Sequence, residues 1–481
     1  MRLATILYKT QANCLGFFVM KVTTNTKKII SDTVTPVSVF LRVRNVYSKV
    51  FLLESSDYKG SDNSFSYICF DPVSSIEINN FNVSIDYNNT VENHKITNNQ
   101  KASYFINNYL KRFQSQNMDF DFPINGLFGY ISYDSIKYFD SIKINRSKEI
   151  KIPDILYYVF KYIVVINHYK NELHIFEHLY GDDKESNIDR IKNLITRKTI
   201  NPFPFNVVGE ETSSFSDKEF KELINKGISH CKVGDIFQIV ISKRFYQKYK
   251  GDDFQVYRAL RSINPSPYLF YFDYGNFKIF GSSPEAQLVV KNNLASIFPI
   301  AGTFKRTGND KKDNILAQKL LVDTKENSEH VMLVDLARND LSKVSNEVVV
   351  EKFKEIQYYS HVIHLVSKVT GKVLKKDTID LISSTFPAGT LSGAPKHKAI
   401  TLINDYERVC REFYGGAIGY LGFNRDFNHA IIIRSFLSKN RTLYYQAGAG
   451  VVAKSIDEKE NNEIYNKIEA LKKALKLAEK L

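Results

Sequence analysis

The stretch Gly126-Leu127-Phe128-Gly129-Tyr130-Ile131-Ser132-Tyr133 decides the fold, because a counterpart returns near the other end of the chain. The counterpart is Gly416-Ala417-Ile418-Gly419-Tyr420-Leu421-Gly422-Phe423, with a similar pattern of glycines and large apolar residues. Apolar runs of this length, interrupted by glycine, are typical of buried strands that another backbone approaches closely. Two related sheet halves packed face to face would explain the repeat, and so would two unrelated buried strands.

Further strands and helices are predicted on both sides of this repeat. Alternating or short apolar runs predict strands at 37–43, 48–54, 235–245, 268–272 and 286–291. Helical spacing predicts helices at 101–113, 309–321 and 325–339, and two capping boxes each begin another, Ser216-Asp217-Lys218-Glu219 and Ser455-Ile456-Asp457-Glu458. Strands and helices that occur in clumps favour a layered α+β fold over a doubly wound one.

The composition changes at 199–215, where Pro202 and Pro204 precede a polar run. Such a stretch is typical of a linker. It predicts an N-terminal domain at 1–198 and a C-terminal domain at 216–481, packed intimately against each other. With 481 residues the chain is long enough for each domain to bury a core of its own.

The chain carries 66 Lys and Arg against 52 Asp and Glu, a net charge of +14. This balance raises nucleic acid or an anionic membrane as partners, but the lysines are scattered, which indicates compositional drift. The four cysteines form no C-x-x-C pair, so neither a zinc site nor a disulfide framework is indicated, which fits a reducing cytoplasm. We expect no signal peptide and no membrane span, since no apolar run approaches about 20 residues.

Two helical segments pair carboxylates at a spacing of three residues. Glu326 and Glu329 share one face of a helix, and Glu460 and Glu463 share a face of another that Lys467 continues. If two such helices faced each other, their oxygens would suit a hard divalent ion such as Mg²⁺. The same spacing is also common on solvated helix faces.

Glycine-rich stretches offer backbone N–H groups to an anion. Gln446-Ala-Gly-Ala-Gly450 is predicted as a loop between a strand at 442–445 and the final helix, and a plain turn explains it as well. The stretch 386–396 combines glycines, hydroxyls and a lysine, which suits an anionic substrate. Its structural alternative is a connection in which Thr390 or Ser392 only caps a helix.

Five motifs, in order along the chain, carry a resemblance to known enzymes. They are Pro299-Ile-Ala-Gly-Thr303, Leu333-Val-Asp-Leu-Ala-Arg-Asn-Asp340, Gly389-Thr-Leu-Ser-Gly-Ala-Pro-Lys396, Tyr414-Gly-Gly-Ala-Ile-Gly-Tyr420 and Gln446-Ala-Gly-Ala-Gly450. Over residues 33–475 the chain resembles the chorismate-utilising enzymes, and among them the large subunits (component I) of anthranilate synthases. The resemblance implies an α/β sandwich of two packed, mainly antiparallel sheets with helices on the outside.

Two positions separate the chemistries of this family. Aminodeoxychorismate synthases place a nucleophilic lysine where this chain has Ala301, and alanine cannot form a covalent intermediate. Isochorismate and salicylate synthases place a water-activating lysine at Gln238, and glutamine is not basic enough for that. The resemblance therefore implies ammonia as the nucleophile, with anthranilate and pyruvate as products. The alternatives are an aminodeoxychorismate synthase of the folate pathway and a non-catalytic basic binding protein.

The resemblance also implies roles for single residues. Glu329 and Glu463 would bind Mg²⁺, the expected cofactor, with Glu326 and Glu460 nearby. Glu285 would be the acid for the departing C4 hydroxyl. The remaining residues would line the site, hold the two carboxylates or supply positive charge: Gly302, Thr303, His364, Thr390, Lys396, Tyr414, Arg434, Gly448, Ala449, Gly450 and Lys467.

A regulatory site and a partner subunit are implied as well. Segments 52–55 and 264–269 resemble the two halves of the family's tryptophan-binding site, which predicts feedback inhibition through Glu54, Ser55, Pro267, Tyr268 and Leu269. Without the resemblance they would be a buried strand and a turn. None of the cysteines lies in a Gly-x-Cys-x-Gly setting, so we expect a separate glutamine amidotransferase subunit (component II), in a cytoplasmic hetero-oligomer, to supply ammonia.

Overall fold

A computed structural model describes residues 19–55, 64–98, 100–116, 118–181, 183, 185–197, 202–358, 362–374 and 378–481, without the side chains of Ala301, Thr303, Lys305 and Lys325. The first 18 residues, where a signal peptide was considered, lie outside the described part. Among the described helices, none combines a membrane-spanning length with sufficient apolar character.

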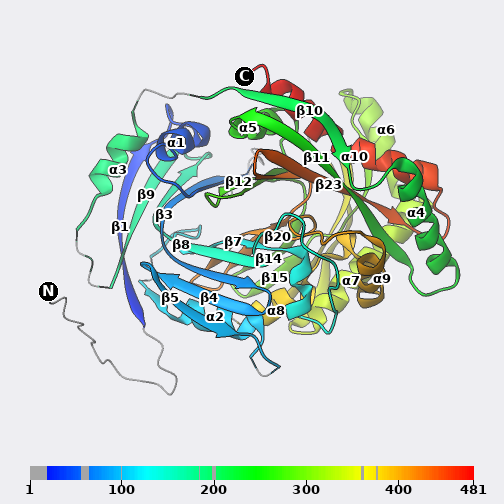
Figure 1. Ribbon diagram of the computed structural model, residues 1–481, viewed down its shortest axis with the longest axis horizontal. Coiled ribbons are helices and arrows are strands. Elements are labelled where there is room, and N and C mark those ends of the chain that lie inside the picture. The colour runs from blue at the N-terminus through cyan, green and yellow to red at the C-terminus, as the bar shows by residue number, and fades with distance from the viewer. Residues whose placement is uncertain are drawn as a thin grey trace.

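Strands dominate the structure, and helices cover them on the outside (Figure 1). The strands are β1 Met20–Ile30, β2 Val50–Glu54, β3 Phe65–Asn79, β4 Asn82–Tyr87, β5 Thr90–Lys95, β6 Phe113–Ser115, β7 Gly126–Ile131, β8 Ile155–Asn167, β9 Glu172–Tyr180, β10 Phe205–Ser213, β11 Gln238–Gly251, β12 Tyr268–Asp273, β13 Lys278–Ser283, β14 Ala286–Lys291, β15 Leu294–Ile297, β16 Ile300–Lys305, β17 Asn346–Tyr358, β18 Val362–Lys372, β19 Gly393–Ala394, β20 Ala417–Gly422, β21 Phe427–Ile431, β22 Ser435–Lys439 and β23 Thr442–Val451. The α-helices are α1 Pro36–Val43, α2 Ala102–Lys111, α3 Ile188–Ile195, α4 Asp217–Lys232, α5 Phe254–Ile263, α6 Asp310–Val322, α7 Thr324–Ser342, α8 Thr378–Thr385, α9 Lys396–Tyr406 and α10 Asp457–Ala478, with 3₁₀ turns η1 Tyr133–Tyr138 and η3 Gly389–Leu391.

The hydrogen-bonded strands form two arms that meet at the long strands β3 and β8. One arm runs β10-β11-β23-β22-β13-β12-β2-β3-β8-β9-β1, and the other runs β4-β3-β8-β7-β20-β21-β14-β15-β18-β17. All these pairs are antiparallel. A β-bulge lies between Pro72 and Ser74 of β3, where the strand passes from one arm to the other. Bulges bend strands, and proline cannot continue the ladder, so the sequence itself marks this corner.

The two arms pack face to face around a shared apolar core. Phe51 and Phe272 of the first arm stack with their ring centroids 4.1 Å apart, in the same cluster as Phe128 and Ile418 of the second arm. Helices α1, α4, α5 and α10 belong to the core outside the first arm, and α2, α7 and α8 to the core outside the second (Figure 1). The predicted α+β sandwich with outer helices is therefore confirmed.

The glycine-punctuated repeat forms neighbouring strands. Strand β7 pairs with β20, with Gly129 opposite Gly419. A Cβ on Gly129 would lie 2.0 Å from the Leu156 carbonyl oxygen, and one on Gly419 would lie 2.1 Å from the Asn428 carbonyl oxygen. Only glycine allows the flanking strands to come this close. The two segments thus lie edge to edge in one arm, so of the two explanations left open for the repeat, two halves packed face to face does not describe these strands.

Two predicted elements take another form. Residues 37–43, expected as a strand, belong to helix α1, because Pro36 occupies its first turn and Thr35 and Ser38 form a capping box. The stretch expected as a linker, 199–215, contains strand β10, which pairs with β11 along its length. The predicted N- and C-terminal domains share both arms, since β2 pairs with β12 and β7 with β20.

The two predicted capping boxes have different outcomes. Ser216 and Glu219 form the expected reciprocal hydrogen bonds at the start of α4. At α10 the helix begins one residue later than predicted, with Ile456 at the N-cap. The Ser455 hydroxyl donates to Glu460 (2.8 Å) and accepts from Val452 N–H, so it is not free to cap the helix.

Candidate active site

The glycine stretch at 448–450 belongs to strand β23, not to the predicted loop. Gly448 pairs with Ser242 and Gly450 with Val240 of β11. The N–H groups of Ser242 and Val240 donate away from β23, to Glu407 and to the Ser392 carbonyl. In an antiparallel ladder the opposite residues of such pairs also turn outward. The N–H groups of both glycines therefore point to the open edge of β23.

Three side chains gather at this edge around Gly448. The Tyr414 hydroxyl is hydrogen-bonded to the Gly448 backbone, and Lys467 of α10 donates to the Gly448 carbonyl (2.8 Å). Lys467 also pairs with Glu463, 2.5 Å away. A Cβ on Gly448 would lie 2.9 Å from the Tyr414 hydroxyl, so glycine keeps this approach open. Burial raises the pKa of Tyr414 to about 12, which keeps it a neutral hydrogen-bonding group.

Helix α7 brings its carboxylates to the other side of the same edge. Gln238 donates to Glu329 (3.0 Å) and lies against Gly450, whose added Cβ would be 2.7 Å from the Gln238 amide nitrogen. Glu326 lies near Gly302, where φ is +68° and an added Cβ would be 3.2 Å from the Glu326 carboxylate. Gln238 thus bridges Glu329 and Gly450, two residues that the sequence analysis placed in one site.

His364 and Thr303 lie opposite each other in the β16–β18 ladder. The His364 ring nitrogen Nδ1 is 3.3 Å from the Gly302 carbonyl oxygen. Burial lowers the pKa of His364, so the ring is neutral at neutral pH and serves as a hydrogen-bonding wall. The side chains of Ala301 and Thr303 lie outside the described part, and only their backbone positions are assigned.

Glu285 and Arg434 are two ionisable side chains of the site that lie close enough to shift each other's pKa. Thr390 donates to the Glu285 carboxylate (2.9 Å). Burial raises the pKa of Glu285 to about 7, against the opposing effects of Thr390, Arg434 and Lys467, so Glu285 carries a proton for much of the time at neutral pH. Burial also lowers the pKa of Arg434, against the field of Tyr414, Glu463 and Glu285. Among the described residues the Arg434 guanidinium has no hydrogen-bond acceptor, which suits it to an anionic ligand.

The donor chemistry of the four glutamates fits a magnesium ion. All four offer oxygen, from the first half of α7 and the first half of α10, and hard divalent ions take one or two direct carboxylates. Polar neighbours hold at least three of them, Gln238 at Glu329, Lys467 at Glu463 and Ser455 at Glu460. In the described part of the chain no three His, Cys, Asp or Glu residues form a closed metal cage. Glu329 and Glu463 would hold the ion, together with groups of the substrate.

Lys396 lies apart from these carboxylates. Its ammonium group donates to Asp340 and to the Thr385 carbonyl (3.0 Å). Asp340 therefore neutralises the positive charge of Lys396, which was expected to lie around the metal site. This pair instead fixes the start of α9 against α7, because Lys396 is the first residue of α9 and Asp340 lies in the last turn of α7.

The two halves of the predicted regulatory site are neighbours. Leu269 lies opposite Glu54 in the β2–β12 ladder, with Tyr268, Pro267 and Ser55 next to them along the chain. Glu54 is buried and paired with Arg261 (2.9 Å), and it accepts a hydrogen bond from Tyr257 (2.6 Å). Its carboxylate is thus tied to Arg261 and Tyr257 of helix α5, and neither residue belongs to the cluster around Glu285.

The sequence analysis did not single out Arg411, a buried arginine that supports the backbone of the site. Arg411 donates to the carbonyl oxygens of Val240 and Leu391 (both 2.6 Å) and pairs with Glu407. It therefore joins β11 to the turn that carries Thr390. The sequence gives no signal for this, because a single arginine shortly before a glycine pair has no diagnostic spacing.

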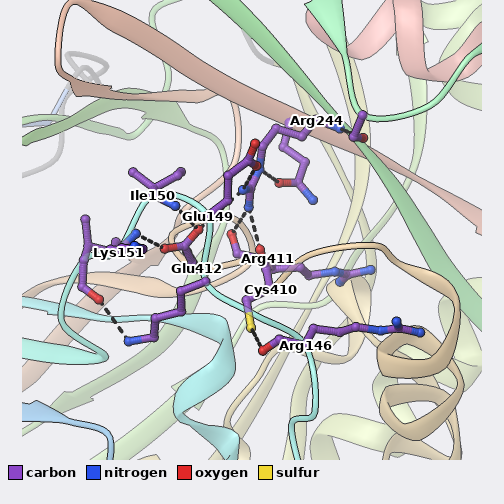
Figure 2. Close-up of polar contacts among 12 residues, drawn as sticks. Arg146, Glu149, Ile150, Lys151, Arg244, Cys410, Arg411 and Glu412 are labelled. Atoms are coloured by element: carbon purple, nitrogen blue, oxygen red, sulfur yellow. Dashed lines mark hydrogen bonds and ion pairs between the residues drawn. The ribbon is translucent and has the colours of Figure 1, made fainter.

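A second buried arginine, Arg244, lies beside it in Figure 2. It donates to the carbonyl oxygens of Cys410 and Arg411 (2.7 and 2.9 Å) and pairs with Glu149 and Glu412. Glu412 in turn accepts from the backbone N–H groups of Ile150 and Lys151 (Figure 2). These bonds fix residues 410–412, the segment that directly precedes Tyr414.

Comparison with known proteins shows the family of the chain. The family model described as chorismate binding enzyme matches residues 49–473. The chain is 37% identical to anthranilate synthase component 1 of Acetivibrio thermocellus over 473 residues, covering 94% of this chain and 95% of that one. It is 35% identical to aminodeoxychorismate synthase component 1 of Bacillus subtilis over 367 residues, covering 74% and 77%.

A solved structure gives the same result for the fold. The crystal structure of anthranilate synthase component I from Streptococcus pneumoniae TIGR4 is similar, with a TM-score of 0.76 and 30% identity over 93% of this chain and 99% of that one. Since the family model covers most of the chain and the relatives span nearly its whole length, the chain belongs to the chorismate binding enzyme family.

Proposed function

We propose that this chain is the chorismate-binding subunit of an anthranilate synthase, in the first step of tryptophan biosynthesis. It would convert chorismate and ammonia into anthranilate, pyruvate and water. The observation that carries the proposal is Glu285, a carboxyl group with a pKa raised to about 7, hydrogen-bonded by Thr390 and close enough to the unpaired Arg434 to feel its charge. A protonatable acid and a free guanidinium match a dianion that must lose a hydroxyl group.

The residues divide the reaction between them. Arg434 and Tyr414 hold the enolpyruvyl carboxylate, and the N–H group of Gly450, at the open edge of β23, receives a carboxylate. The Gly448 backbone is hydrogen-bonded to the Tyr414 hydroxyl and positions it. Glu285 protonates the C4 hydroxyl as ammonia attacks C2, so that water leaves. Loss of the C2 proton and of pyruvate from C3 then makes the ring aromatic. Mg²⁺, held by Glu329 and Glu463, would supply positive charge for the ring carboxylate when bound.

Two residues favour anthranilate over the other products of the family. Ala301 offers no nucleophile, which disfavours the aminodeoxychorismate synthase alternative that the Bacillus subtilis relative represents. Gln238 is committed to Glu329 and cannot activate water. A non-catalytic basic binding protein, the other alternative, is disfavoured because Glu285, Arg434 and Tyr414 lie within electrostatic reach of one another.

Ammonia supply and regulation complete the proposal. We infer that a glutamine amidotransferase subunit docks on this chain and delivers ammonia, since relatives are named component 1. Tryptophan would inhibit from the end of the β2–β12 pair, where Glu54, Ser55, Tyr268 and Leu269 adjoin. The protein would act in the cytoplasm.

Product analysis tests the function directly. We expect the purified chain to form anthranilate from chorismate with ammonium and Mg²⁺, detected by anthranilate fluorescence, and to form none with glutamine alone. Because the chain contains no tryptophan, no tryptophan emission of the protein overlaps with that of anthranilate. Formation of isochorismate or aminodeoxychorismate in place of anthranilate would refute the proposal.

Glu463→Gln tests the metal ligands. Removal of one direct carboxylate is expected to reduce Mg²⁺-dependent activity by about 1000-fold, an activation cost of about 4 kcal/mol, with unchanged thermal unfolding. Glu469→Gln is the matched control, because Glu469 lies on the same helix and pairs with Lys473 (2.7 Å) at the same spacing as Glu463 with Lys467. Full activity of Glu463→Gln would show that the metal assignment is wrong.

A further inference from the structure

A cavity with a volume of about 490 Å³ lies beside the segment that precedes Tyr414. Its walls come from the turn between β3 and β4, from η1 and from residues 144–152, and Cys410 also lines it. The Cys410 thiol donates to the Arg146 carbonyl oxygen (3.0 Å), a bond drawn in Figure 2. No described residue that lines the cavity belongs to the candidate active site. The cavity is thus a separate candidate, and its volume lies in the range of about 300–1000 Å³ that is typical of ligand sites.

The charged residues that line this cavity are all cationic. Lys137, Arg146, Lys148 and Lys151 belong to its walls, and no Asp or Glu of the described residues does. The sequence analysis regarded the lysines behind the +14 net charge as scattered, but folding gathers four cations here. A hollow lined by one sign of charge concentrates ions of the opposite sign. The cavity therefore favours an anionic ligand.

Lys137 and Lys148 are held in place and largely removed from water. Their side chains are 11% and 14% exposed, and both ammonium groups contact the carboxylate of Asp154, at 2.9 and 2.7 Å. Against the effect of burial, Lys148 and Lys137 keep the pKa of Asp154 below its ordinary value, so Asp154 is ionised at neutral pH. One negative charge thus balances two positive ones. Because a partly buried charge without a counter-charge is costly, this wall favours a further anion.

Arg146 and Lys151 add two more positive charges, and both residues are exposed. Arg146 donates to two backbone carbonyl oxygens in the last turn of α9 (2.7 and 2.5 Å), which orient its guanidinium without neutralising it. Neither side chain forms an ion pair with a carboxylate among the described residues. Glu77 is a further carboxylate whose charge acts on Lys148, so four positive charges meet at most two negative ones, those of Glu77 and Asp154. The surplus of positive charge matches a ligand with two or more negative charges.

We propose that this cavity binds a small ligand with at least two negative charges on phosphate or carboxylate groups. A guanidinium recognises either group with paired donors, and ammonium groups add charge without a geometric demand. The recessed pair Lys137 and Lys148 favours a small ligand over a nucleic acid, whose phosphates lie along an extended backbone. The proposal does not depend on the proposed function, because no residue of the candidate active site takes part.

Isothermal titration calorimetry of the full chain with pyrophosphate or citrate tests the site, in the absence of Mg²⁺ so that no metal complex forms. We expect Arg146→Met/Lys151→Met to weaken binding by about tenfold or more, because each lost cation removes a charge-assisted contact. Lys311→Met/Lys312→Met is the matched control, since it removes the same charge from two exposed lysines of α6. The same Kd in both double variants would overturn the proposal.

The choice of anion identifies the chemistry of the ligand. Citrate carries its charges on carboxylates, so the tighter binder of the two distinguishes a carboxylate ligand from a phosphate ligand. Acetate has a single charge, and we expect it to bind more weakly than both by about tenfold or more. If neither polyanion binds the unaltered chain, or if acetate binds as tightly as they do, the proposal is overturned.

Two further variants place the bound anion. Lys151→Glu reverses one exposed charge and decides alone if the double variant does not fold, because unchanged binding would then overturn the proposal. Arg434→Met should leave the Kd unchanged, whereas a loss as large as that of the double variant would place the anion in the candidate active site and overturn the proposal. A single-stranded oligonucleotide that binds more tightly than both polyanions, and that Arg146→Met/Lys151→Met weakens, would assign these cations to nucleic acid instead.

Discussion

Two arginine clusters, one buried and one partly buried, lie close together in this chain and are completed in opposite ways. Arg244 and Arg411 are each 1% exposed, and both are bonded to carboxylates and to backbone carbonyl oxygens (Figure 2). Arg434 has no hydrogen-bond acceptor among the described residues, and Glu285 beside it has a pKa raised to about 7 by burial. The first cluster satisfies its charges within the chain, and the second does not.

This difference indicates that the first cluster stabilises the fold and that the second binds a ligand. A buried charge that is fully bonded fixes the backbone around it, whereas a partly exposed charge without a hydrogen-bond acceptor is available to a ligand of opposite charge. Arg411 ties β11 to the turn of Thr390, so the paired cluster holds the unpaired one in place. Substitutions in the two clusters should therefore change different quantities, stability in the first and catalysis in the second.

The largest effect is expected from breaking the paired cluster. Arg411→Met leaves Glu407 buried without its cation and frees two carbonyl oxygens, so we expect a loss of about 3–5 kcal/mol of unfolding free energy. Urea unfolding followed by circular dichroism measures it. The double variant Arg411→Met/Glu407→Gln removes the unpaired charge while keeping an acceptor for Ser242, and should recover part of the loss. A single variant as stable as the unaltered chain would contradict the distinction.

The sequence predicts single helices and strands better than it predicts which strands pair. Elements with strong local signals occur where expected, such as α4 behind its capping box and β14 at Ala286–Lys291. Helix α1 was missed because a short run with alternating apolar residues does not distinguish strand from helix, and the Thr35 cap decides it. Which strands become neighbours depends on contacts far apart in the chain, and the pairing of β7 with β20 is of this kind.

The site could be predicted where motifs carry it, and not where packing does. Thr390 is hydrogen-bonded to Glu285 and Tyr414 to Gly448, and the charge of Arg434 acts on both Glu285 and Tyr414, while the roles that the resemblance implied for them stay predictions. The glycine stretch was expected as a loop because glycine usually marks turns, but the register with β11 makes it a strand edge. The role of Arg411 depends on which groups it bonds in three dimensions, and no spacing in the sequence records that.

A smaller effect, on catalysis alone, should follow from Arg434→Lys. Lysine keeps the charge but loses the planar pair of donors that holds a carboxylate, so we expect kcat/KM for chorismate to fall about 100-fold, or about 2.7 kcal/mol. The control is Arg425→Lys. Burial lowers the pKa of Arg425 as it does that of Arg434, and both residues have a positive φ. The Arg425 guanidinium donates to Asn107. Equal activity of the two variants would remove the functional reason for the unpaired guanidinium.

The smallest effect concerns stability at Glu285 and has the opposite sign to that at Arg411. The pKa of Glu285 is raised to about 7 in the folded chain from 4.5, so folding favours its neutral form. Stability from this group is complete below about pH 4.5 and is lost as the pH rises through 7. Glu285→Gln stays neutral, so at pH 8 it should be more stable than the unaltered chain by on the order of 1 kcal/mol, although inactive. In the unaltered enzyme, kcat should fall as the pH rises through about 7.

Glu54→Gln provides the opposite case, because Glu54 is buried with its carboxylate already paired to Arg261. That substitution should lower the midpoint of thermal unfolding at pH 8, while Glu285→Gln raises it. The gain at Glu285 should also disappear when the two chains are compared at pH 4, where the carboxyl group is protonated in both states. A Glu285→Gln chain that unfolds at a lower temperature than the unaltered one at pH 8 would mean that Glu285 is held as an ion, and the contrast between the two clusters would then have to rest on Arg434 alone.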